Sequence, residues 1–486
     1  MVFVQKVLKG LFTSGGFRGS VLTLLTGTSI ALIAAYFAKP ILARLYSPEA
    51  FGLADVFVSL VSILVPVASL RYEDALMLPE EEEDAAGILR LSFLLSLIIS
   101  ALSVALIVWR QNISEWLGAP DLAPWLWLVP LTLLIVRAGK LAESWLVRLK
   151  QFRPISVAQI ARTSVMVSTR IGAGIPAVGA GVGGLIVGFI IGNLASTGLV
   201  LNRLGRTRFS FFGSSPSSSL LRIARRYRHF PFFTLPSTFL SALLSRLPFL
   251  LLIVFFDKTV VGYFGMAFSA LLVPLSLIGM AISQVFFIHA AEAKNPSELS
   301  ELTSGVYRRL IMIGLFPTIV LLLAGPDIFD VVFSHAWRPA GEYVQRLAPW
   351  LFFTALASPL TRLFDVLERQ RLDLAISFFM LGFLSLALVI GGRLGNPLQC
   401  MLLIGLTGMG VRVAQIGILL HLGTVSLRSM ILPFLRYAFY ACPAIIGLLI
   451  MLNFNNPLMT TLTAASGGVV FGLFVLWRDD ILQLKS

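Results

Sequence analysis

Charged residues are scarce in this sequence, and acidic residues are the scarcest of them. Only 13% of the 486 residues are Asp, Glu, Lys or Arg, whereas 57% are hydrophobic, and the mean hydropathy is +0.89. A soluble domain needs a far larger polar surface than this composition supplies. The sequence therefore predicts a polytopic membrane protein.

Cysteine and histidine are too few and too dispersed for a disulfide framework or a metal site. The two cysteines, Cys400 and Cys442, both lie in apolar runs, and the four histidines are far apart in the sequence. Structural metal sites need several such ligands at short spacing. The sequence also has no Walker-type phosphate loop. We therefore expect neither a metal nor another cofactor.

Positive charge is in excess, with a formal net charge of +14 and a pI near 10.2. In a soluble protein such a balance would indicate a nucleic-acid partner. Here the basic residues lie in short loops between apolar runs, or inside the runs themselves. We therefore expect contact with membrane lipids and no nucleic-acid partner.

The apolar runs predict an all-α fold of fourteen transmembrane helices, because a spanning helix takes about 20 mostly apolar residues. The predicted spans are residues 20–44, 49–70, 87–109, 122–147, 154–174, 179–202, 230–255, 261–288, 304–325, 343–367, 372–392, 397–421, 432–452 and 457–477. They form a first lobe of six helices within residues 1–205 and a second within 229–425. A basic cytoplasmic linker at 206–228 joins the lobes, and two additional spans follow in 426–486.

Basic loops and a weak internal repeat predict how these helices are arranged. With the N-terminus inside, most loop lysines and arginines fall on the cytoplasmic side, where such residues are enriched in membrane proteins. Both termini are therefore predicted to be cytoplasmic. The segments 43–57 and 253–267 are similar, with Gly52 matching Gly262. Six spans in each half then predict two lobes related by a pseudo-two-fold axis along the membrane normal.

Several cations interrupt the apolar runs, although each charge at mid-bilayer costs roughly 2.5–3.5 kcal/mol on insertion scales. They are Lys39, Arg137, Lys140, Arg162, Arg170, Arg246, Arg346 and Arg412. So many charges of one sign predict a water-filled cavity that accepts an anion.

The fourth predicted span has the most polar helix face. Arg137, Lys140, Ser144 and Arg148 recur at spacings of three or four residues, and Glu143 can pair with Lys140. Such a stripe faces either a cavity that binds an anionic substrate or an ion network between helices. The sequence leaves both alternatives open.

We predict substrate contacts for six cations, because Arg and Lys bind phosphate groups well and Arg does so with a planar donor fork. The first three are Arg137, Lys140 and Arg246, and the next three are Lys39, Arg162 and Arg346. Glu143 and Asp55 are the candidates for coupling to a proton or a sodium ion. A salt bridge to a neighbouring cation is the alternative for both carboxylates.

The segment after the second predicted span carries a family resemblance. Tyr72-Glu73 is followed by an apolar step, by Pro79 and by an acidic run that ends in alanine at position 85. This order, together with the opening segment 14–57, resembles the polysaccharide transporter family of Wzx-type O-antigen flippases. That family belongs to the multidrug/oligosaccharidyl-lipid/polysaccharide exporter superfamily, and its members often have twelve spans.

The resemblance implies a carrier, not an enzyme. It implies that undecaprenyl-diphosphate-linked oligosaccharide, an O-antigen or exopolysaccharide repeat unit, is flipped across the bacterial inner membrane by alternating access. The cavity cations would neutralise the diphosphate, and polysaccharide polymerase machinery is a candidate partner.

Three alternatives remain. A lipid-II flippase would differ only in the headgroup that it carries. A multidrug or cation antiporter would need an acidic or aromatic cavity. A membrane-embedded glycosyltransferase or polymerase would need catalytic carboxylates or a large outer catalytic loop.

Overall fold

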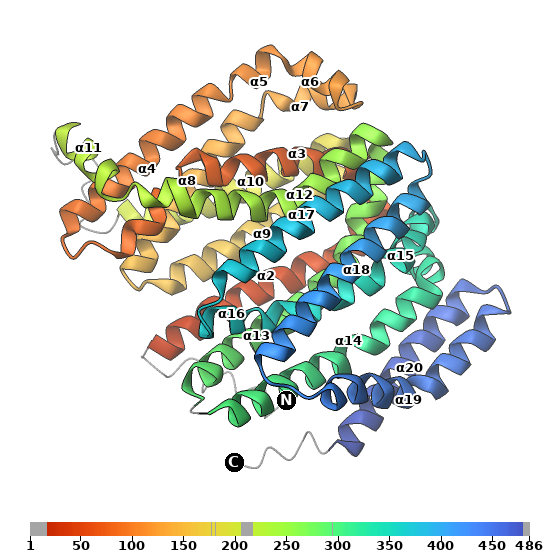
Figure 1. Cartoon of the computed structure of the whole chain (residues 1–486). Helices are drawn as coiled ribbons and strands as arrows, with labels where there is room; N and C mark the ends of the chain where they lie inside the picture. Colours follow the sequence, from red (N-terminus) through yellow and green to blue (C-terminus); the bar gives the residue numbers. More distant parts are fainter. Residues whose placement is uncertain (1–16, 176, 180, 206–216, 294, 480–486) are drawn as a thin grey trace. The chain divides into compact units, whose positions relative to one another are not determined.

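The regular structure in the part of the chain that is described is entirely helical (Figure 1). A computed structural model describes residues 17–175, 177–179, 181–205, 217–293 and 295–479. The internal contacts of the chain divide it into two compact units, Met1–Lys258 and Thr259–Ser486.

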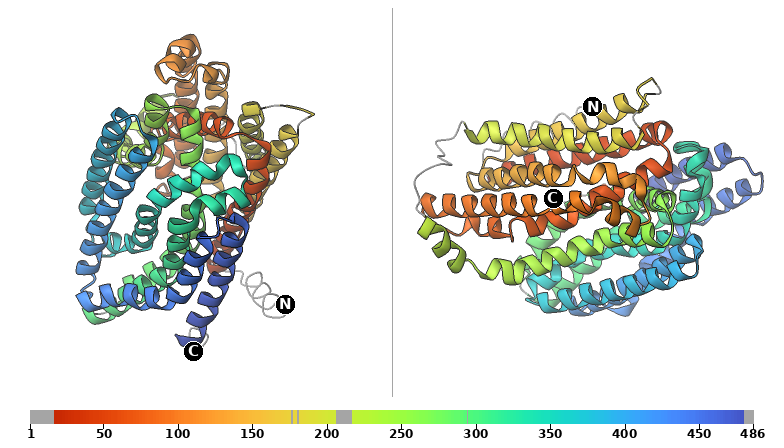
Figure 2. Two further views of the ribbon diagram at one scale, coloured as in Figure 1. Left: turned by 90° about the vertical axis from the view of Figure 1, so that its right-hand side faces the viewer. Right: turned by 90° about the horizontal axis from the view of Figure 1, so that it is seen from above.

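The first unit contains most of the charged helices. Its elements are α2 (Phe17–Leu45), α3 (Pro48–Ala68), η1 (Tyr72–Met77), α4 (Glu82–Leu102), α5 (Ala105–Val108), α6 (Arg110–Trp116), η2 (Pro120–Leu122), α7 (Ala123–Leu126), α8 (Val129–Arg148), α9 (Phe152–Gly174), α10 (Gly181–Gly205), α11 (Ser217–Arg226), η3 (Phe230–Thr234) and α12 (Leu235–Phe255). The long helices of this unit run side by side (Figure 2). Buried apolar residues from η1, α4, α8, α9, α10 and α11 form one hydrophobic core that holds these elements together.

The second unit is built around α14, α15 and α18. Its elements are α13 (Lys258–Glu292, which starts at the last residue of the first unit), α14 (Pro296–Val332), η4 (His335–Trp337), α15 (Arg338–Leu360), α16 (Arg362–Val366), α17 (Gln370–Arg393), α18 (Pro397–Leu422), α19 (Leu427–Leu452) and α20 (Pro457–Arg478). The last two helices pack against α14, where Phe316 stacks on Phe471 with ring centroids 4.9 Å apart.

All fourteen predicted spans fall on helical segments, but not all of these segments are equally apolar. Twelve helices are long and apolar enough to cross a membrane, and the pair Pro120–Leu126 and Val129–Arg148, bent by 53°, makes thirteen. The remaining predicted span lies in α9, which carries Arg153, Arg162 and Arg170 over 23 residues. Because α9 packs against α2 and α10, its arginines Arg162 and Arg170 are half-buried in protein, whereas Arg153 at its start is exposed.

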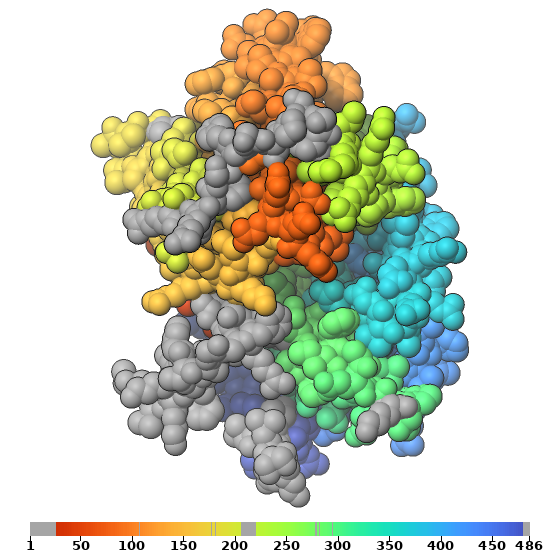
Figure 3. All heavy atoms as spheres, turned by 90° about the vertical axis from the view of Figure 1, so that its left-hand side faces the viewer, coloured from red at the N-terminus to blue at the C-terminus, as the bar shows by residue number. Residues whose placement is uncertain are grey.

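The boundaries predicted for the lobes stay a prediction. The division by internal contacts includes α12 in the first unit, where this helix packs against α3. Residues 206–216 of the predicted linker lie outside the described ranges, and residues 217–226 form α11. Arg226 of α11 pairs with Asp84 at 3.0 Å, and Ile223 fills the space above Gly87 of α4. Figure 3 shows α11 beside the turn between α3 and α4.

Small residues on α10 let α9 approach closely, at the positions of Arg162 and Arg170. A Cβ atom on Gly192 would lie 2.7 Å from the carbonyl oxygen of Arg162, and one on Gly188 would lie 2.6 Å from Cγ of Arg170. Small residues repeated every four positions allow this kind of close contact between membrane helices.

We predict that Gly192→Val separates α9 from α10 and lowers thermal stability. Overpacking of a tight contact costs typically 1–3 kcal/mol, so the unfolding temperature in detergent should fall by several degrees. Gly198→Val is the matched control on the same helix, because a Cβ at position 198 meets nothing within 4 Å. Equal unfolding temperatures for the two variants would contradict the close contact.

Candidate functional site

A cavity of about 230 Å³ lies within the first unit, between α3, α8, α9, α10 and α12. Four charged side chains line it: Lys140, Glu143, Arg162 and Arg246. The rest of the lining consists of valines, one phenylalanine, one glycine and small polar side chains, among them Ser62. We call this space the first-unit cavity. It brings together three of the predicted substrate contacts and one of the predicted coupling residues.

The carboxylate of Glu143 is already engaged by two donors. Lys140 Nζ lies 2.7 Å from Glu143 Oε2, and Gln159 Nε2 of α9 donates to Glu143 Oε1 at 3.0 Å. The Glu143 side chain is 14% exposed, whereas that of Lys140 is 49% exposed. Lys140 therefore has a fixed counter-charge but remains accessible to a ligand.

Arg162 and Arg246 are held more loosely. Both are half-buried, and neither forms an ion pair within the described residues. The guanidinium of Arg246 lies 5.9 Å from the centre of the Phe249 ring, and Arg162 interacts electrostatically with Glu143. Their donor groups are thus available for an anion in the cavity.

A second group of charges surrounds Asp55 on α3. Its carboxylate interacts electrostatically with Lys39 of α2, Arg170 of α9 and Arg246. Arg170 Nε also donates to the carbonyl oxygen of Leu185 at 3.1 Å. Arg246 belongs to both charge groups. Together the two groups contain the five cations Lys39, Lys140, Arg162, Arg170 and Arg246 and the carboxylates of Asp55 and Glu143.

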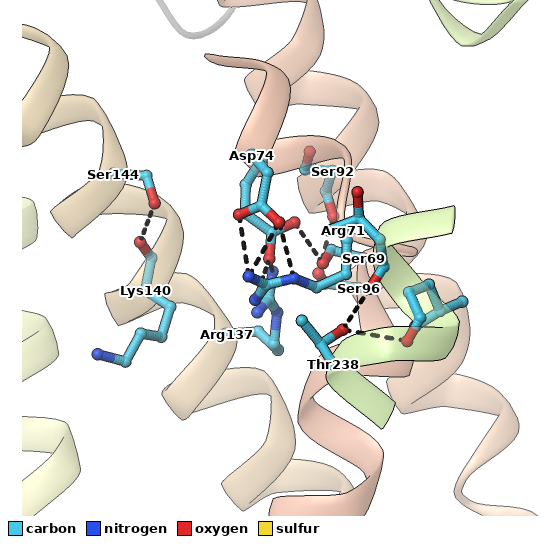
Figure 4. Close-up of polar contacts among 12 residues, drawn as sticks. Ser69, Arg71, Asp74, Ser92, Ser96, Arg137, Lys140, Ser144 and Thr238 are labelled. Carbon is cyan, nitrogen blue, oxygen red and sulfur yellow. Dashed lines mark hydrogen bonds and ion pairs between the residues drawn. The ribbon is translucent and has the colours of Figure 1, made fainter. Parts of the chain in front are cut away.

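Arg137 lies in a different environment from Lys140, although the two are one helical turn apart. Its side chain is 1% exposed, and its Nη2 lies 3.0 Å from Glu73 Oε1. Ser69 donates to the other oxygen of Glu73, and Arg71 binds Asp74 through two hydrogen bonds of 3.0 Å. Figure 4 shows Lys140 directed away from this cluster, which we call the Arg137 network.

The Arg137 network is neutral and fixes the connection between α3 and α4. Its two arginines balance Glu73 and Asp74. Partial burial raises the pKa of the Asp74 carboxyl, and the charge of Arg71 opposes that shift. Arg71 itself adopts the left-handed backbone region, with φ of 61°. The charge of Arg137 is thus compensated within the network by the carboxylate of Glu73. The arrangement around Arg137 matches the ion-network alternative for this part of the polar stripe.

The other end of the stripe also secures this connection. Arg148 donates to the carbonyl oxygens of Leu76 at 2.7 Å and Pro79 at 2.8 Å. The predicted stripe is therefore divided, because Arg137 and Arg148 hold the η1 turn while Lys140 lines the first-unit cavity.

Arg346 belongs to the second unit. It is half-buried on α15, where its Nη1 donates to the carbonyl oxygen of Glu342 at 2.7 Å. Its predicted contact with substrate stays a prediction, as do those of the other five cations and the coupling roles of Asp55 and Glu143. Reasoning from sequence missed Gln159. Its position three residues before Arg162, on the same face of α9, was the available signal.

A match to a known protein family shows the family of this chain. A model of the family described as polysaccharide biosynthesis protein matches residues 41–342, which is more than half of the chain. The chain belongs to this family. The resemblance to polysaccharide transporters drawn from the sequence is thereby confirmed.

One relative in sequence is the succinoglycan biosynthesis transport protein ExoT of Rhizobium meliloti (strain 1021). It is 31% identical over 123 residues, which are 25% of this chain and 24% of that protein. The match thus spans about a quarter of the length of ExoT.

Solved transporters share the fold at low sequence identity. The lipid II flippase MurJ in its inward closed conformation aligns with a TM-score of 0.76 and 15% identity, over 95% of this chain and 99% of that one. An inward-facing MATE family multidrug transporter aligns with a TM-score of 0.58 and 15% identity, over 83% and 96%. A MOP superfamily transporter from Pyrococcus furiosus aligns at 0.55 and 15%, over 84% and 97%. The chain therefore shares the fold of these transporters, and its apolar helices make it a multi-pass membrane protein.

The Arg137 network predicts a pronounced double-mutant effect. Arg137→Met leaves Glu73 buried beside one arginine that is already shared with Asp74, and loss of one partner of a buried pair costs about 3–5 kcal/mol. Arg137→Met combined with Glu73→Leu leaves Arg71 and Asp74 balanced, so the double variant should unfold closer to the wild type than the single one. Additive destabilisation in denaturant unfolding would contradict the pairing.

Proposed function

We propose that this protein moves an undecaprenyl-diphosphate-linked oligosaccharide across the bacterial inner membrane by alternating access, with both termini in the cytoplasm. The observation that carries the proposal is the cation excess at the first-unit cavity, where Arg162 and Arg246 lack ion-pair partners among the described residues. Membership of the polysaccharide biosynthesis family and the succinoglycan transport role in the name of ExoT support the substrate class.

A diphosphate suits this charge arrangement. Guanidinium groups offer two parallel donors to phosphate oxygens, and such charge-assisted bonds are stronger where water is scarce. Arg162 and Arg246 can donate without breaking an existing ion pair. Lys140 has to exchange the Glu143 carboxylate for phosphate, and because it is half-exposed that exchange is open to a ligand in the cavity.

The same exchange of partners at Lys140 would couple substrate binding to the binding of an ion. Once substrate recruits Lys140, Glu143 loses its cation and becomes a site for a proton or a sodium ion. Asp55 is the second candidate, since it is the counter-charge of Lys39, Arg170 and Arg246. Binding of the ion would restore neutrality and favour release of the substrate on the other side.

A lipid-II flippase is the second candidate function. The alignment with MurJ covers nearly the whole of both chains, and lipid II presents the same diphosphate. An antiporter of organic cations fits less well, because the first-unit cavity is positively charged, as is its substrate.

We predict that Arg162→Gln and Arg246→Gln each reduce flipping of a fluorescent polyprenyl-diphosphate oligosaccharide in proteoliposomes by tenfold or more. Loss of one charge-assisted contact costs about 1.5–3 kcal/mol, which corresponds to this factor. Arg110→Gln is the matched control, because Arg110 is an exposed arginine on α6 outside the cavity. Full activity in both cavity variants would refute the proposed substrate path. Competition by added lipid II against the oligosaccharide lipid distinguishes the two headgroups.

The coupling proposal is tested by Glu143→Gln. This variant keeps a hydrogen-bonding side chain but cannot take up a proton or bind a cation as a carboxylate. Flipping should become insensitive to imposed proton and sodium gradients, with at least a fivefold smaller response than in the wild type. Glu115→Gln on α6, an exposed position, serves as the control. An unaltered gradient response in Glu143→Gln would exclude this residue as the coupling site.

A further inference from the structure

The second unit contains a pocket of about 840 Å³ that is lined by α13, α14 and α19. One part of its lining is apolar and includes Val285, Phe286 and Leu432, and another part carries arginines. Pockets of this size accommodate a ligand the size of a lipid headgroup with part of its chains. We call it the second-unit pocket, and it does not depend on the proposed translocation path.

The positive charge in this pocket comes from α14 and α19. Arg308 and Arg309 are exposed on α14, and neither forms an ion pair within the described residues. Arg308 is close enough to α19 to interact electrostatically with Tyr437. These two guanidinium groups are therefore available donors on one wall of the pocket.

Arg436, the third arginine, is already compensated. It is bound to Asp479, and its Nε donates to the Tyr440 hydroxyl at 2.9 Å. The hydroxyl of Tyr437 donates to the other oxygen of Asp479 at 2.6 Å. Arg436 thus holds the end of α20 against α19 and contributes little to the charge that a ligand meets.

The acidic residues of the pocket lie toward its other end. Glu298 and Glu301 are in the first two turns of α14, and Arg308 follows Glu301 by seven residues. At about 1.5 Å per residue the two positions are about 10 Å apart along the helix. His289 lies at the end of α13, 3.9 Å from Glu292. The arginines therefore form a separate positive region beside the apolar wall.

The apolar wall is open to the surroundings at Val285 and Leu432, whereas Phe286 is buried beneath it. The side chain of Val285 is 59% exposed and that of Leu432 is 51% exposed, with Ile288, Ile431 and Leu435 exposed nearby. In a membrane protein such side chains face acyl chains. An amphipathic ligand can thus place its chains on this surface and its headgroup on the arginines.

We propose that the second-unit pocket binds a phosphate-bearing lipid, with the phosphate on Arg308 and Arg309 and the chain along Val285 and Leu432. Basic pockets between membrane helices bind anionic lipid headgroups in this way. The shared chemistry is the lipid phosphate, and its source is either a membrane phospholipid or a polyprenyl phosphate.

A substitution at Gly305 can fill the pocket without changing its charge. Gly305 lines the pocket, and a Cβ at this position meets nothing within 4 Å. Gly305→Leu should therefore fold normally and occupy the space of the ligand. Gly382→Leu on α17 is its matched control, since position 382 is equally open and lies outside the pocket. Arg371→Gln, at an exposed position of α17, is the control for the double variant Arg308→Gln, Arg309→Gln.

The experiment measures binding to the purified full-length protein in detergent with four probes: short-chain phosphatidylglycerol, undecaprenyl phosphate, a diacylglycerol of the same chain length and inorganic phosphate. At least one phosphate-bearing lipid should bind saturably. Its affinity should fall about tenfold in the arginine double variant and in Gly305→Leu but not in the two controls. The tighter of the two lipid phosphates identifies the source.

Three results would overturn the proposal. If diacylglycerol bound as tightly as the lipid phosphate, the pocket would be an apolar surface without phosphate recognition. If inorganic phosphate bound as tightly, the lipid chain would play no part in binding. Affinities unchanged in both the arginine variant and Gly305→Leu would place any lipid elsewhere. Arg246→Gln separates this proposal from the proposed function, because it should reduce flipping and leave binding at the second-unit pocket unchanged.

Discussion

The cost of placing charge among apolar helices determines how the first unit is built. A guanidinium group in such surroundings needs a carboxylate, a set of carbonyl oxygens or water, because an uncompensated charge costs several kcal/mol. The first unit provides a carboxylate, carbonyl oxygens and a cavity. Arg137 has Glu73, Arg148 has the carbonyls of Leu76 and Pro79, and Arg162 lines a cavity.

These solutions depend on how closely the helices approach one another. The glycines of α10 bring α9 near enough for its backbone at Arg162 to be covered, and Gln159 of the same helix then reaches Glu143 on α8. The charge pattern of the first-unit cavity is therefore a consequence of packing between small residues. A larger residue at Gly192 would move Gln159 and Arg162 together, so stability and the electrostatics of the cavity are coupled through one contact.

The positions of the helices could be predicted from the sequence, because the length of an apolar run is a local property. The environment of each cation could not. Arg137 and Lys140 occur on one helix with the same spacing pattern, yet Arg137 meets Glu73 from a connection 64 positions earlier and Lys140 does not. The presence of α9 among the helices was predictable, but its contacts with α2 and α10, which leave Arg162 and Arg170 half-buried, were not. The local sequence pattern does not show which residues from distant parts of the chain will pair with a given cation.

A carrier has to release what it binds, and the proposed role of Glu143 addresses that requirement. A cavity with cations alone would hold a diphosphate too tightly, since each additional guanidinium strengthens binding in both orientations of the carrier. With Glu143 beside Lys140 at 2.7 Å, the proposed substrate would compete with an internal carboxylate. The net gain in binding free energy from Lys140 would then be the difference between two ion pairs. Arg162 and Arg246 have no such competitor among the described residues, so they would supply affinity while Lys140 and Glu143 would make it reversible. Removing the carboxylate should therefore tighten binding of the diphosphate at the same time as it slows its release.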